Sequence, residues 1–141
     1  MSALAFLSTP EPAGPGVVEL RGAVDVFGAP AGERHVWLTD RRALVVVFGG
    51  SLRPVVERAR AAGLRAYDVS AAYVAVPVEG ETLLRRLTDV DPATFPAAGP
   101  VARDVPAVLL READERYLAL VPRELADHVR EVVLDLEQGL A

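Results

Sequence analysis

The sequence contains no cysteine, lysine, isoleucine or asparagine. Without cysteine the chain can form no disulfide, no thiolate nucleophile and no zinc–thiolate site. Lysine, isoleucine and asparagine share A/T-rich codons, so a GC-rich genome explains their absence more simply than any function does. Because lysine is missing, arginine and two histidines are the basic side chains that can contribute to binding or catalysis.

Long apolar runs and an excess of positive charge are also missing. No run approaches the roughly 18 apolar residues that a membrane-crossing helix needs. The 15 basic and 20 acidic residues give a net charge of -5, which argues against binding to nucleic acid or to anionic membranes. The stretch Met1–Leu7 has no basic residue and is too short in its apolar part for a signal peptide. We therefore expect a cytoplasmic protein.

What the sequence does contain is enough apolar material for one domain. Its 141 residues are 51% hydrophobic, so most of the chain should fold around a core. The segment Ser8–Gly16 holds three prolines and two glycines. This composition predicts a flexible N-terminal lead-in over residues 1–16, followed by a single domain over residues 17–141 without internal repeats.

Alternating and continuous apolar patterns predict strands in the first third of this domain. Val17–Phe27 indicates one strand or two short ones, and Gly28–Glu33 a turn. His35–Leu38 and Ala43–Phe48 indicate an N-terminal hairpin. The continuous apolar run of its second strand is typical of a strand that is covered on both faces.

A helix is predicted directly after this hairpin. Ser51 is a suitable N-cap, and Gly63 stands where a helix commonly ends with a left-handed residue. Between them, apolar side chains recur at helical spacing and form one face. These side chains are Leu52, Val55, Val56 and Ala59.

The remaining elements complete an α+β pattern. Strands are predicted over Arg65–Val69, Ala72–Val78, Ala107–Arg111 and Arg116–Val121, and helices over Gly80–Leu87 and from Pro122 to Gly139. The stretch Asp89–Pro106 is too rich in proline and glycine to be regular. The order predicts a ferredoxin-like β-α-β-β-α-β core with an extra strand, the N-terminal hairpin and a C-terminal helix.

No set of residues forms a recognisable catalytic or metal-binding motif. His35 and His128 are far apart and lack ligand spacing. Gly49–Ser51 can hold an anion at a helix start, but it lacks the lysine of a phosphate-binding loop and is better explained as a turn. Asp68 and Ser70 are explained by a turn between strands. The carboxylates Asp89, Asp91 and Asp104 lack the dense spacing of a calcium loop.

The long segment Asp89–Pro106 is the best candidate for a contact surface, because long loops inside compact domains tend to be functional. Its aromatic residue Phe95 is placed to dock into a partner or, alternatively, to fold back on the core. Several arginines can clamp an anion, and among them we single out Arg103 because it lies in this loop. The arginines considered are Arg41, Arg42, Arg53, Arg85, Arg86 and Arg103.

Several short motifs, in this order, carry a likeness to a known family. They are Asp68-Val69-Ser70, Val76-Pro77-Val78-Glu79-Gly80, Leu83–Leu87, Asp89-Val90-Asp91, Phe95-Pro96, Arg103, Val108–Arg111 and Tyr117–Arg123. With these motifs, residues 66–136 resemble the folate-binding aminomethyltransferase superfamily of glycine-cleavage T-proteins. Within it, the chain is most similar to the gamma subunit of heterotetrameric sarcosine oxidase. Two positions depart from the pattern: Glu81 follows Gly80, and Glu124-Leu125 follows Arg123.

The resemblance implies a folate-binding type of fold in a chain without the family's catalytic aspartate, because no segment here carries that motif. It therefore implies a noncatalytic subunit that packs against oxidoreductase subunits, or against itself, in a sarcosine oxidase-like flavoenzyme complex. No catalytic residue and no metal are assigned, and tetrahydrofolate is a cofactor by resemblance only. An alternative hypothesis, based on fold analogy, is a stand-alone domain that binds an amino acid or folate.

Overall fold

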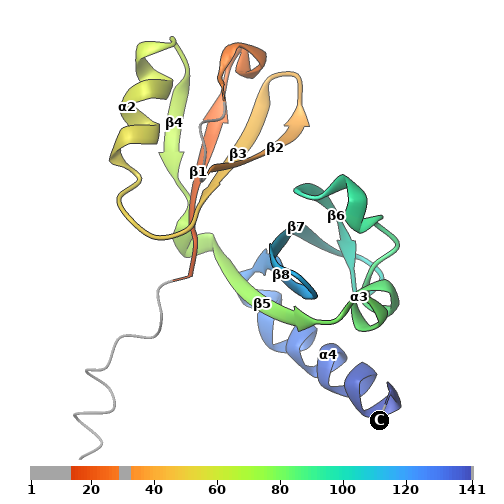
Figure 1. Cartoon of the computed structure of the whole chain (residues 1–141). Helices are drawn as coiled ribbons and strands as arrows, with labels where there is room; N and C mark the ends of the chain where they lie inside the picture. The colour runs from red at the N-terminus through yellow and green to blue at the C-terminus, as the bar shows by residue number, and fades with distance from the viewer. Residues whose placement is uncertain (1–13, 29–32, 141) are drawn as a thin grey trace, which may run out of the picture.

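The computed structural model describes residues 14–28 and 33–140. Most of the predicted flexible lead-in, and residues 29–32 of the predicted turn at Gly28–Glu33, lie outside these residues. The described part forms four layers, which are a helix, two antiparallel sheets and a pair of helices (Figure 1).

The first sheet is built from the N-terminal half of the chain. Its strands are β1 (Gly16–Arg21), β2 (Glu33–Thr39), β3 (Arg42–Val47) and β4 (Arg65–Asp68), in the order β2-β3-β1-β4. All neighbours are antiparallel. Helix α2 (Arg53–Ala61) covers the outer face of this sheet, and a 3-10 turn, η1 (Val24–Val26), follows β1.

The second sheet is built from the C-terminal half. Its strands are β5 (Tyr73–Glu79), β6 (Ala97–Val101), β7 (Val105–Ala113) and β8 (Arg116–Pro122), in the order β5-β8-β7-β6. Helices α3 (Glu81–Leu87) and α4 (Ala126–Leu140) cover its outer face. Three 3-10 turns link elements in this half: η2 (Ser70–Ala72), η3 (Pro92–Thr94) and η4 (Arg123–Leu125).

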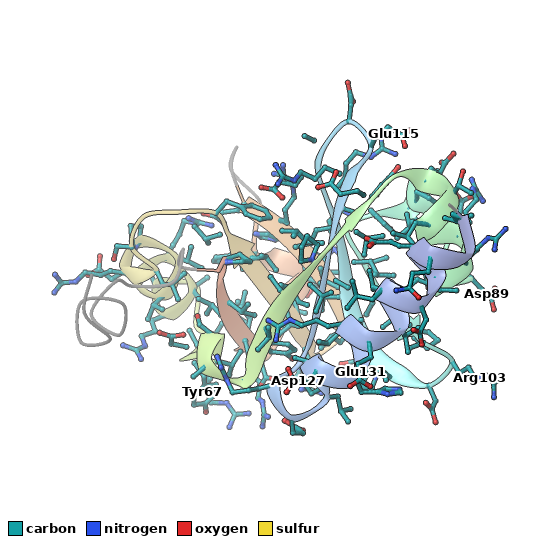
Figure 2. The ribbon with its side chains drawn as sticks, turned by 90° about the horizontal axis from the view of Figure 1, so that it is seen from below. Tyr67, Asp89, Arg103, Glu115, Asp127 and Glu131 are labelled. Atoms are coloured by element: carbon teal, nitrogen blue, oxygen red, sulfur yellow. The ribbon has the colours of Figure 1, made fainter. Side chains whose placement is uncertain are left out.

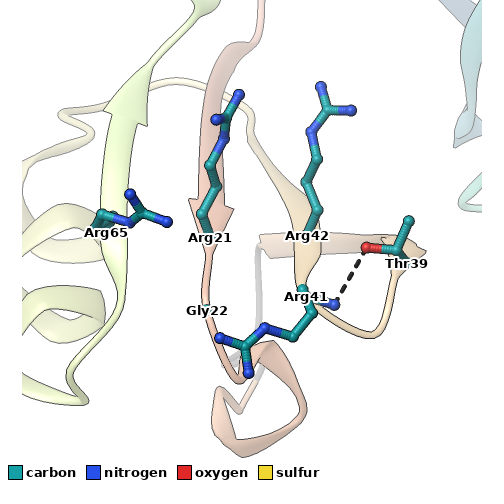
Figure 3. A pocket seen from close by; sticks show the side chains of 6 residues that line it. All are labelled: Arg21, Gly22, Thr39, Arg41, Arg42 and Arg65. Atoms are coloured by element: carbon teal, nitrogen blue, oxygen red, sulfur yellow. Dashed lines mark hydrogen bonds between the residues drawn. The ribbon is translucent and has the colours of Figure 1, made fainter.

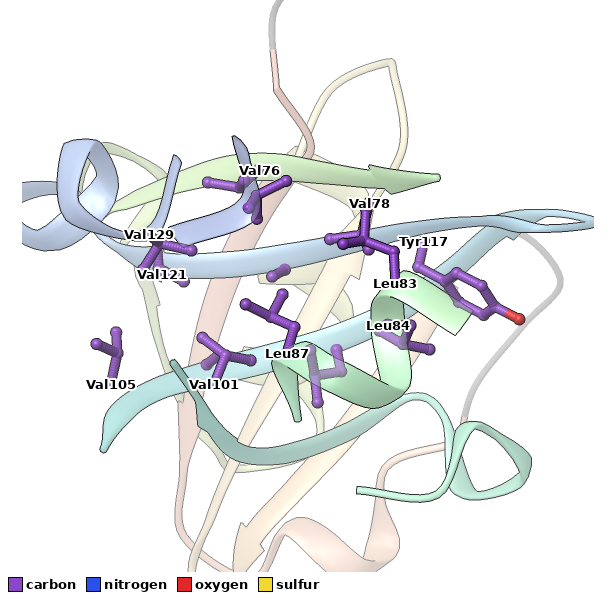
Figure 4. Close-up of a cluster of buried hydrophobic side chains, with 14 of the residues drawn as sticks. Val76, Val78, Leu83, Leu84, Leu87, Val101, Val105, Tyr117, Val121 and Val129 are labelled. Atoms are coloured by element: carbon purple, nitrogen blue, oxygen red, sulfur yellow. The ribbon is translucent and has the colours of Figure 1, made fainter. Parts of the chain in front are cut away.

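Three apolar layers hold these elements together. The largest lies between the second sheet and its two helices and includes Leu84, Leu109 and Val129 (Figure 4). A second lies between the first sheet and α2. The third lies between the two sheets, where Leu44 and Val46 pack with Leu110 and Leu120. The central strands β1, β3 and β8 therefore contain runs of residues buried on both faces, as the continuous apolar run in β3 predicted for that strand.

The predicted α+β class is confirmed, and the element order is consistent with a ferredoxin-like core. The hairpin β2–β3, helix α2 and helix α3 lie where the sequence placed them. Gly63 ends α2 in a left-handed conformation at φ +82°, with Leu64 N donating to Ala59 O at 3.0 Å. Val17–Phe27 forms strand β1 and the short turn η1 rather than two strands.

The prediction that Asp89–Pro106 lacks regular structure is wrong for part of this segment. It contains η3 and strand β6, which pairs with β7 from Ala97↔Leu109 to Val101↔Val105. Pro100 lies in this strand. Because β6 is an edge strand, no further strand pairs with its outer side. A proline in β6 therefore interrupts no backbone hydrogen bonding on that side.

The predicted start of the last helix at Pro122 is also wrong. Pro122 ends strand β8 in an extended conformation and pairs with Tyr73 of β5. The regular helix α4 begins four positions later, at Ala126, after the turn η4. The sequence predicted that this helix ends at Gly139. In the structure α4 continues through Gly139 and ends at Leu140.

Candidate functional site

Three arginines lie directly opposite one another on three neighbouring strands of the first sheet. Arg21 of β1 is the register partner of Arg42 on β3 and of Arg65 on β4. Directly opposite residues in a sheet project to the same face. Figure 3 shows the three side chains on adjacent strands, with Arg41 in the turn beside them. We call Arg42, Arg21 and Arg65 the arginine row.

The buried carboxylate of Glu19 is the counter-charge of this row. It lies two residues before Arg21 on β1, so both side chains are on the same face of the sheet. Arg21 Nε donates to Glu19 Oε2 at 2.8 Å, and Arg42 Nη2 donates to Glu19 Oε1 at 2.6 Å. The Glu19 side chain is 9% exposed, whereas those of Arg21 and Arg42 are 49% and 46% exposed. One buried acid thus orients two arginines whose outer ends reach solvent.

The surroundings of Glu19 keep its carboxyl group ionised. Burial alone would raise its pKa, but hydrogen bonds from Arg42 and Arg21, together with their charges, outweigh burial and hold the pKa below its usual value. The effect extends to Tyr73, whose pKa is raised by burial and further by the negative charge of Glu19. The carboxylate is therefore a permanent part of the site at neutral pH.

The arginine row lines an open pocket of about 480 Å³, which we call the arginine pocket. The turn between β2 and β3 contributes Thr39 and Arg41, and the end of β1 contributes Gly22. Thr39 Oγ1 accepts a hydrogen bond from Arg41 N at 3.1 Å, which fixes the turn at the pocket's rim (Figure 3). Gly22 has φ +129°, and its N–H donates to Arg41 O at 2.9 Å, so the rim and the strand end are joined.

The sequence indicated only part of this cluster. Arg41 and Arg42 were among the arginines considered as an anion clamp, but Arg21 and Arg65 were not. Arg21 and Arg65 each lie at the end of a different strand, and no local sequence pattern links one to the other. Their proximity depends on the pairing of β1 with β4, which joins residues more than 40 positions apart. A correct strand pairing would have been needed to find the row.

The two predicted contact residues, Phe95 and Arg103, lie in different surroundings. The ring of Phe95 is half-buried and meets the ring of Tyr117 edge-on at 6.0 Å between centroids. Arg103 is exposed in the turn between β6 and β7, with φ +78°. Figure 2 shows Arg103 well separated from Tyr67, whose ring centroid lies 5.8 Å from Cζ of Arg21. The structure does not bring Arg103 and the row together.

Asp68 and Ser70 form a local turn at the passage from the first sheet to the second. Ser70 N and Ser70 Oγ both donate to Asp68 Oδ1, at 3.0 and 2.7 Å. These hydrogen bonds lower the pKa of the Asp68 carboxyl. Ser70 Oγ also accepts from Val17 N at 2.8 Å, which ties β1 to the turn. The predicted turn role of both residues is confirmed.

The two histidines are far apart in the fold, as they are in the sequence. His35 on β2 stacks on Phe27 with 5.3 Å between centroids and lies 3.2 Å from Glu33 Oε1. Arg58 of α2 binds the same carboxylate, and although burial works against ionisation, the hydrogen bonds of Arg58 and His35 hold the pKa of Glu33 below its usual value. His128 is exposed on α4.

The loop motifs serve as turns and caps. The predicted N-cap role of Ser51 is wrong by one position: Leu52 occupies the N-cap of α2, and Ser51 Oγ, in the turn before it, accepts from Arg53 N at 3.1 Å. Gly49 and Gly50 of this turn have positive φ values of 73° and 77°. Asp91 accepts from Ala93 N at 3.0 Å and caps η3. Within residues 14–28 and 33–140, no group of three or more histidine, aspartate or glutamate side chains is arranged to hold a metal ion.

Over the same described ranges, none of the helices combines the length and apolar character that a bilayer crossing requires.

Comparison with known proteins gives a likeness in fold but not in sequence. By sequence, the chain matches no protein family and no curated protein. By structure, it is similar to a chain of heterotetrameric sarcosine oxidase from Corynebacterium sp. U-96, whose structure was determined in complex with pyrrole 2-carboxylate. The TM-score is 0.69, the identity is 15%, and the match covers 89% of this chain and 80% of that one. The resemblance to sarcosine oxidase is thus confirmed at the level of the fold.

Proposed function

We propose that this protein is a noncatalytic, gamma-type subunit, or a homologue of one, in a sarcosine oxidase-like flavoenzyme complex. In this proposal it has the fold type of the folate-binding aminomethyltransferases and acts in the cytoplasm. It packs against the amine-oxidising subunits or against a second copy of itself.

The observation that carries the proposal is the extent of the structural match. It includes most of both chains, so the two chains are of similar length and the likeness extends over a whole polypeptide. A shared βα motif alone would match a smaller part of each chain. The neighbour belongs to a heterotetramer, which supports a role for this chain in an assembly.

The roles of the polar side chains support the noncatalytic part of the proposal. Catalytic acids and bases need to reach a substrate with hydrogen-bonding capacity to spare. Here Asp68 is held by Ser70, and Glu33 by Arg58 and His35, in contacts that connect strands, turns and a helix. These carboxylates therefore serve the fold.

The proposed contact surface includes the predicted loop residues Phe95 and Arg103. Arg103 projects from the β6–β7 turn (Figure 2). Exposed arginines at an interface can form two parallel hydrogen bonds to a carboxylate of a partner. Phe95 is half-buried, so a partner can reach only part of its ring. Tetrahydrofolate binding remains a prediction of the resemblance, and a thermal-shift titration with tetrahydrofolate tests it.

Co-expression with the flavin-dependent amine-oxidising subunits of a sarcosine oxidase tests the proposal. We expect a complex of fixed stoichiometry that survives size-exclusion chromatography, and sarcosine oxidation that needs the flavin-bearing subunit. A chain that remains monomeric in the presence of these subunits would overturn the subunit role. Oxidation or aminomethyl transfer by the isolated chain would overturn the noncatalytic role.

Charge reversal at Arg103 tests the contact loop within the same experiment. Arg103→Glu should weaken the complex because it replaces a donor by a repelled carboxylate. Arg86→Glu is the matched control, since Arg86 is an exposed arginine at the end of α3. Equal effects of the two substitutions would argue against a specific contact at Arg103.

A further inference from the structure

The arginine row is energetically unfavourable on its own. Like charges directly opposite each other on neighbouring strands destabilise a sheet, and here the arrangement occurs twice, at Arg21↔Arg42 and Arg21↔Arg65. Arg41 brings a fourth positive charge to the same pocket. The whole chain, in contrast, carries a net charge of -5. Positive charge is therefore concentrated at this end of the first sheet.

Glu19 compensates only part of this charge. It occupies Nε of Arg21 and Nε and Nη2 of Arg42. Glu19 accepts no hydrogen bond from the Nη groups of Arg21 or from Nη1 of Arg42, and both side chains are about half-exposed. Because a guanidinium is planar and rigid, binding one edge to Glu19 fixes the direction of the other donors. Arg65 and Arg41 add donors that Glu19 does not engage.

We propose that the arginine pocket binds a small molecule that carries two or more adjacent anionic groups, of the diphosphate or polycarboxylate class. Arginine forks match both carboxylate and phosphate oxygens. Neighbouring strands are about 4.8 Å apart, so the row is roughly 10 Å wide. Across three strands, two adjacent anionic groups can engage more of the row's donors than a single phosphate or carboxylate can.

The form of the site favours a small molecule over a protein segment. The pocket is a shallow, open depression, and its volume of about 480 Å³ lies within the range of about 300–1,000 Å³ that is usual for small-ligand sites. Its lining consists of guanidinium, hydroxyl and backbone groups, with Gly22 as the residue without a side chain. The lining is more polar than apolar, so the site offers mainly charge and hydrogen-bond donors. This inference does not depend on the proposed subunit role.

Isothermal titration of the full chain with pyrophosphate and with citrate tests the inference. The titrations are done at one ionic strength, with sodium sulfate as the comparison anion. We expect saturable binding of one or both probes, tighter than sulfate. The preferred probe identifies the source of the anionic groups, phosphate or carboxylate. If neither probe binds more tightly than sulfate, the proposal is overturned.

Substitutions distinguish specific binding in the arginine pocket from a general effect of net charge on binding. Arg65→Ala should weaken binding about tenfold or more, because hydrogen bonds to charged groups are lost. This variant leaves both Glu19 ion pairs in place. Arg41→Ala, in the turn, should also weaken binding, and it serves as the second variant if Arg65→Ala folds poorly. The control Arg86→Ala removes the same charge on α3 and should leave the affinity unchanged.

Equal losses in Arg65→Ala and Arg86→Ala would overturn the proposal, because binding would then follow net charge. If no probe binds and Arg65→Ala instead abolishes assembly with the oxidase subunits, the row is a protein contact and the small-ligand proposal is likewise overturned. Probe binding with the expected variant pattern supports the proposal, whether or not the chain assembles with a partner.

Discussion

At the scale of single residues, the central feature is a buried carboxylate among arginines. Burying Glu19 costs free energy, and its ion pairs and charge-assisted hydrogen bonds to Arg42 and Arg21 offset this cost. Without Glu19, the positive charges of the arginine row would repel one another across strands β3, β1 and β4. Glu19 therefore stabilises the end of the first sheet and orients the pocket's donors at the same time.

Glu19→Gln should destabilise the protein by about 2 kcal/mol at neutral pH, because hydrogen bonds to a charged group are lost and the row keeps its repulsion. Urea unfolding measures this change. The matched control is Glu57→Gln on α2, where the carboxylate is 68% exposed and pairs with Arg53. An exposed pair contributes at most about 1 kcal/mol. Equal losses in the two variants would contradict a special role for Glu19.

The loss of stability in Glu19→Gln should depend on pH. The folded-state pKa of Glu19 lies below its unfolded-state value, so its stabilisation is present at neutral pH and is lost as pH falls through the folded-state pKa. The difference in unfolding free energy between wild type and Glu19→Gln should shrink in the acid range. Unfolding curves at about pH 7 and about pH 3 measure it. A constant difference would contradict the charge-based account.

Ser70→Ala should cost about 1–2 kcal/mol, because it leaves the N–H of the buried residue Val17 without its acceptor. It should also raise the pKa of Asp68 part of the way toward its usual value, since the hydrogen bond from the Ser70 hydroxyl is lost while that from the backbone N–H of residue 70 remains. Thr82→Ala, at an exposed position of α3, is the control and should have little effect. Unfolding curves and an NMR titration of Asp68 measure the two effects.

How well single residues could be predicted depends on how local their partners are. The turn role of Asp68 and Ser70 could be predicted because the two side chains are two positions apart. The arginine row could not be predicted, because its members meet only after three strands pair. For Phe95 the sequence left two outcomes open, and the contact with Tyr117 depends on a distant strand.

At the scale of elements, strand β6 is held against the loop before it. An added Cβ at Gly99 would clash with Cγ2 of Val90. Gly99→Ala should therefore destabilise the protein by about 1–3 kcal/mol through overpacking. Gly139→Ala on α4 is the matched control, because nothing lies within 4 Å of an added Cβ there. That substitution should stabilise the helix by about 0.5 kcal/mol.

A double-mutant cycle tests the contact between Gly99 and Val90. Val90→Ala removes the side chain that Gly99→Ala would meet, so the loss in Gly99→Ala should become smaller in the Val90→Ala background. Thermal or urea unfolding of the four proteins measures the coupling. Additive losses would show that β6 does not pack on Val90 as described.

The errors at this scale have a common cause. Helices α2 and α3 could be predicted because their apolar faces, and the glycine that ends α2, are encoded locally. Proline was taken as a breaker in β6 and as a helix start at Pro122. In the fold, Pro100 lies in an edge strand and Pro122 pairs at the end of β8. Both outcomes are set by tertiary pairing, which overrides local preference.

At the scale of the whole molecule, the division of the strands between two sheets is the feature that the sequence did not show. β1 pairs with β3 and β4 to complete the first sheet, and β5 pairs with β8 to complete the second. The α+β class could be predicted from element order, because each apolar pattern is local. The layers required contacts between distant strands, such as Leu44 and Val46 against Leu110.

The fold likeness gives the whole-molecule proposal its support. A chain with a similar fold belongs to a heterotetrameric sarcosine oxidase. The edge strands β5 and β6 of the second sheet each contain a proline, Pro77 and Pro100, which disfavours extension of that sheet by a partner strand. We therefore expect a partner to pack through side chains, as the exposed Arg103 allows.

Native mass spectrometry of the chain co-expressed and purified with the flavin-dependent subunits of a sarcosine oxidase tests the central claim most directly. Our account predicts one mass that contains this chain and the flavin-bearing subunit in a fixed ratio. It also predicts that the Arg103→Glu variant lowers the occupancy of that complex while Arg86→Glu does not. A mass for this chain that never includes the flavin-bearing subunit, at any concentration used, would contradict the account.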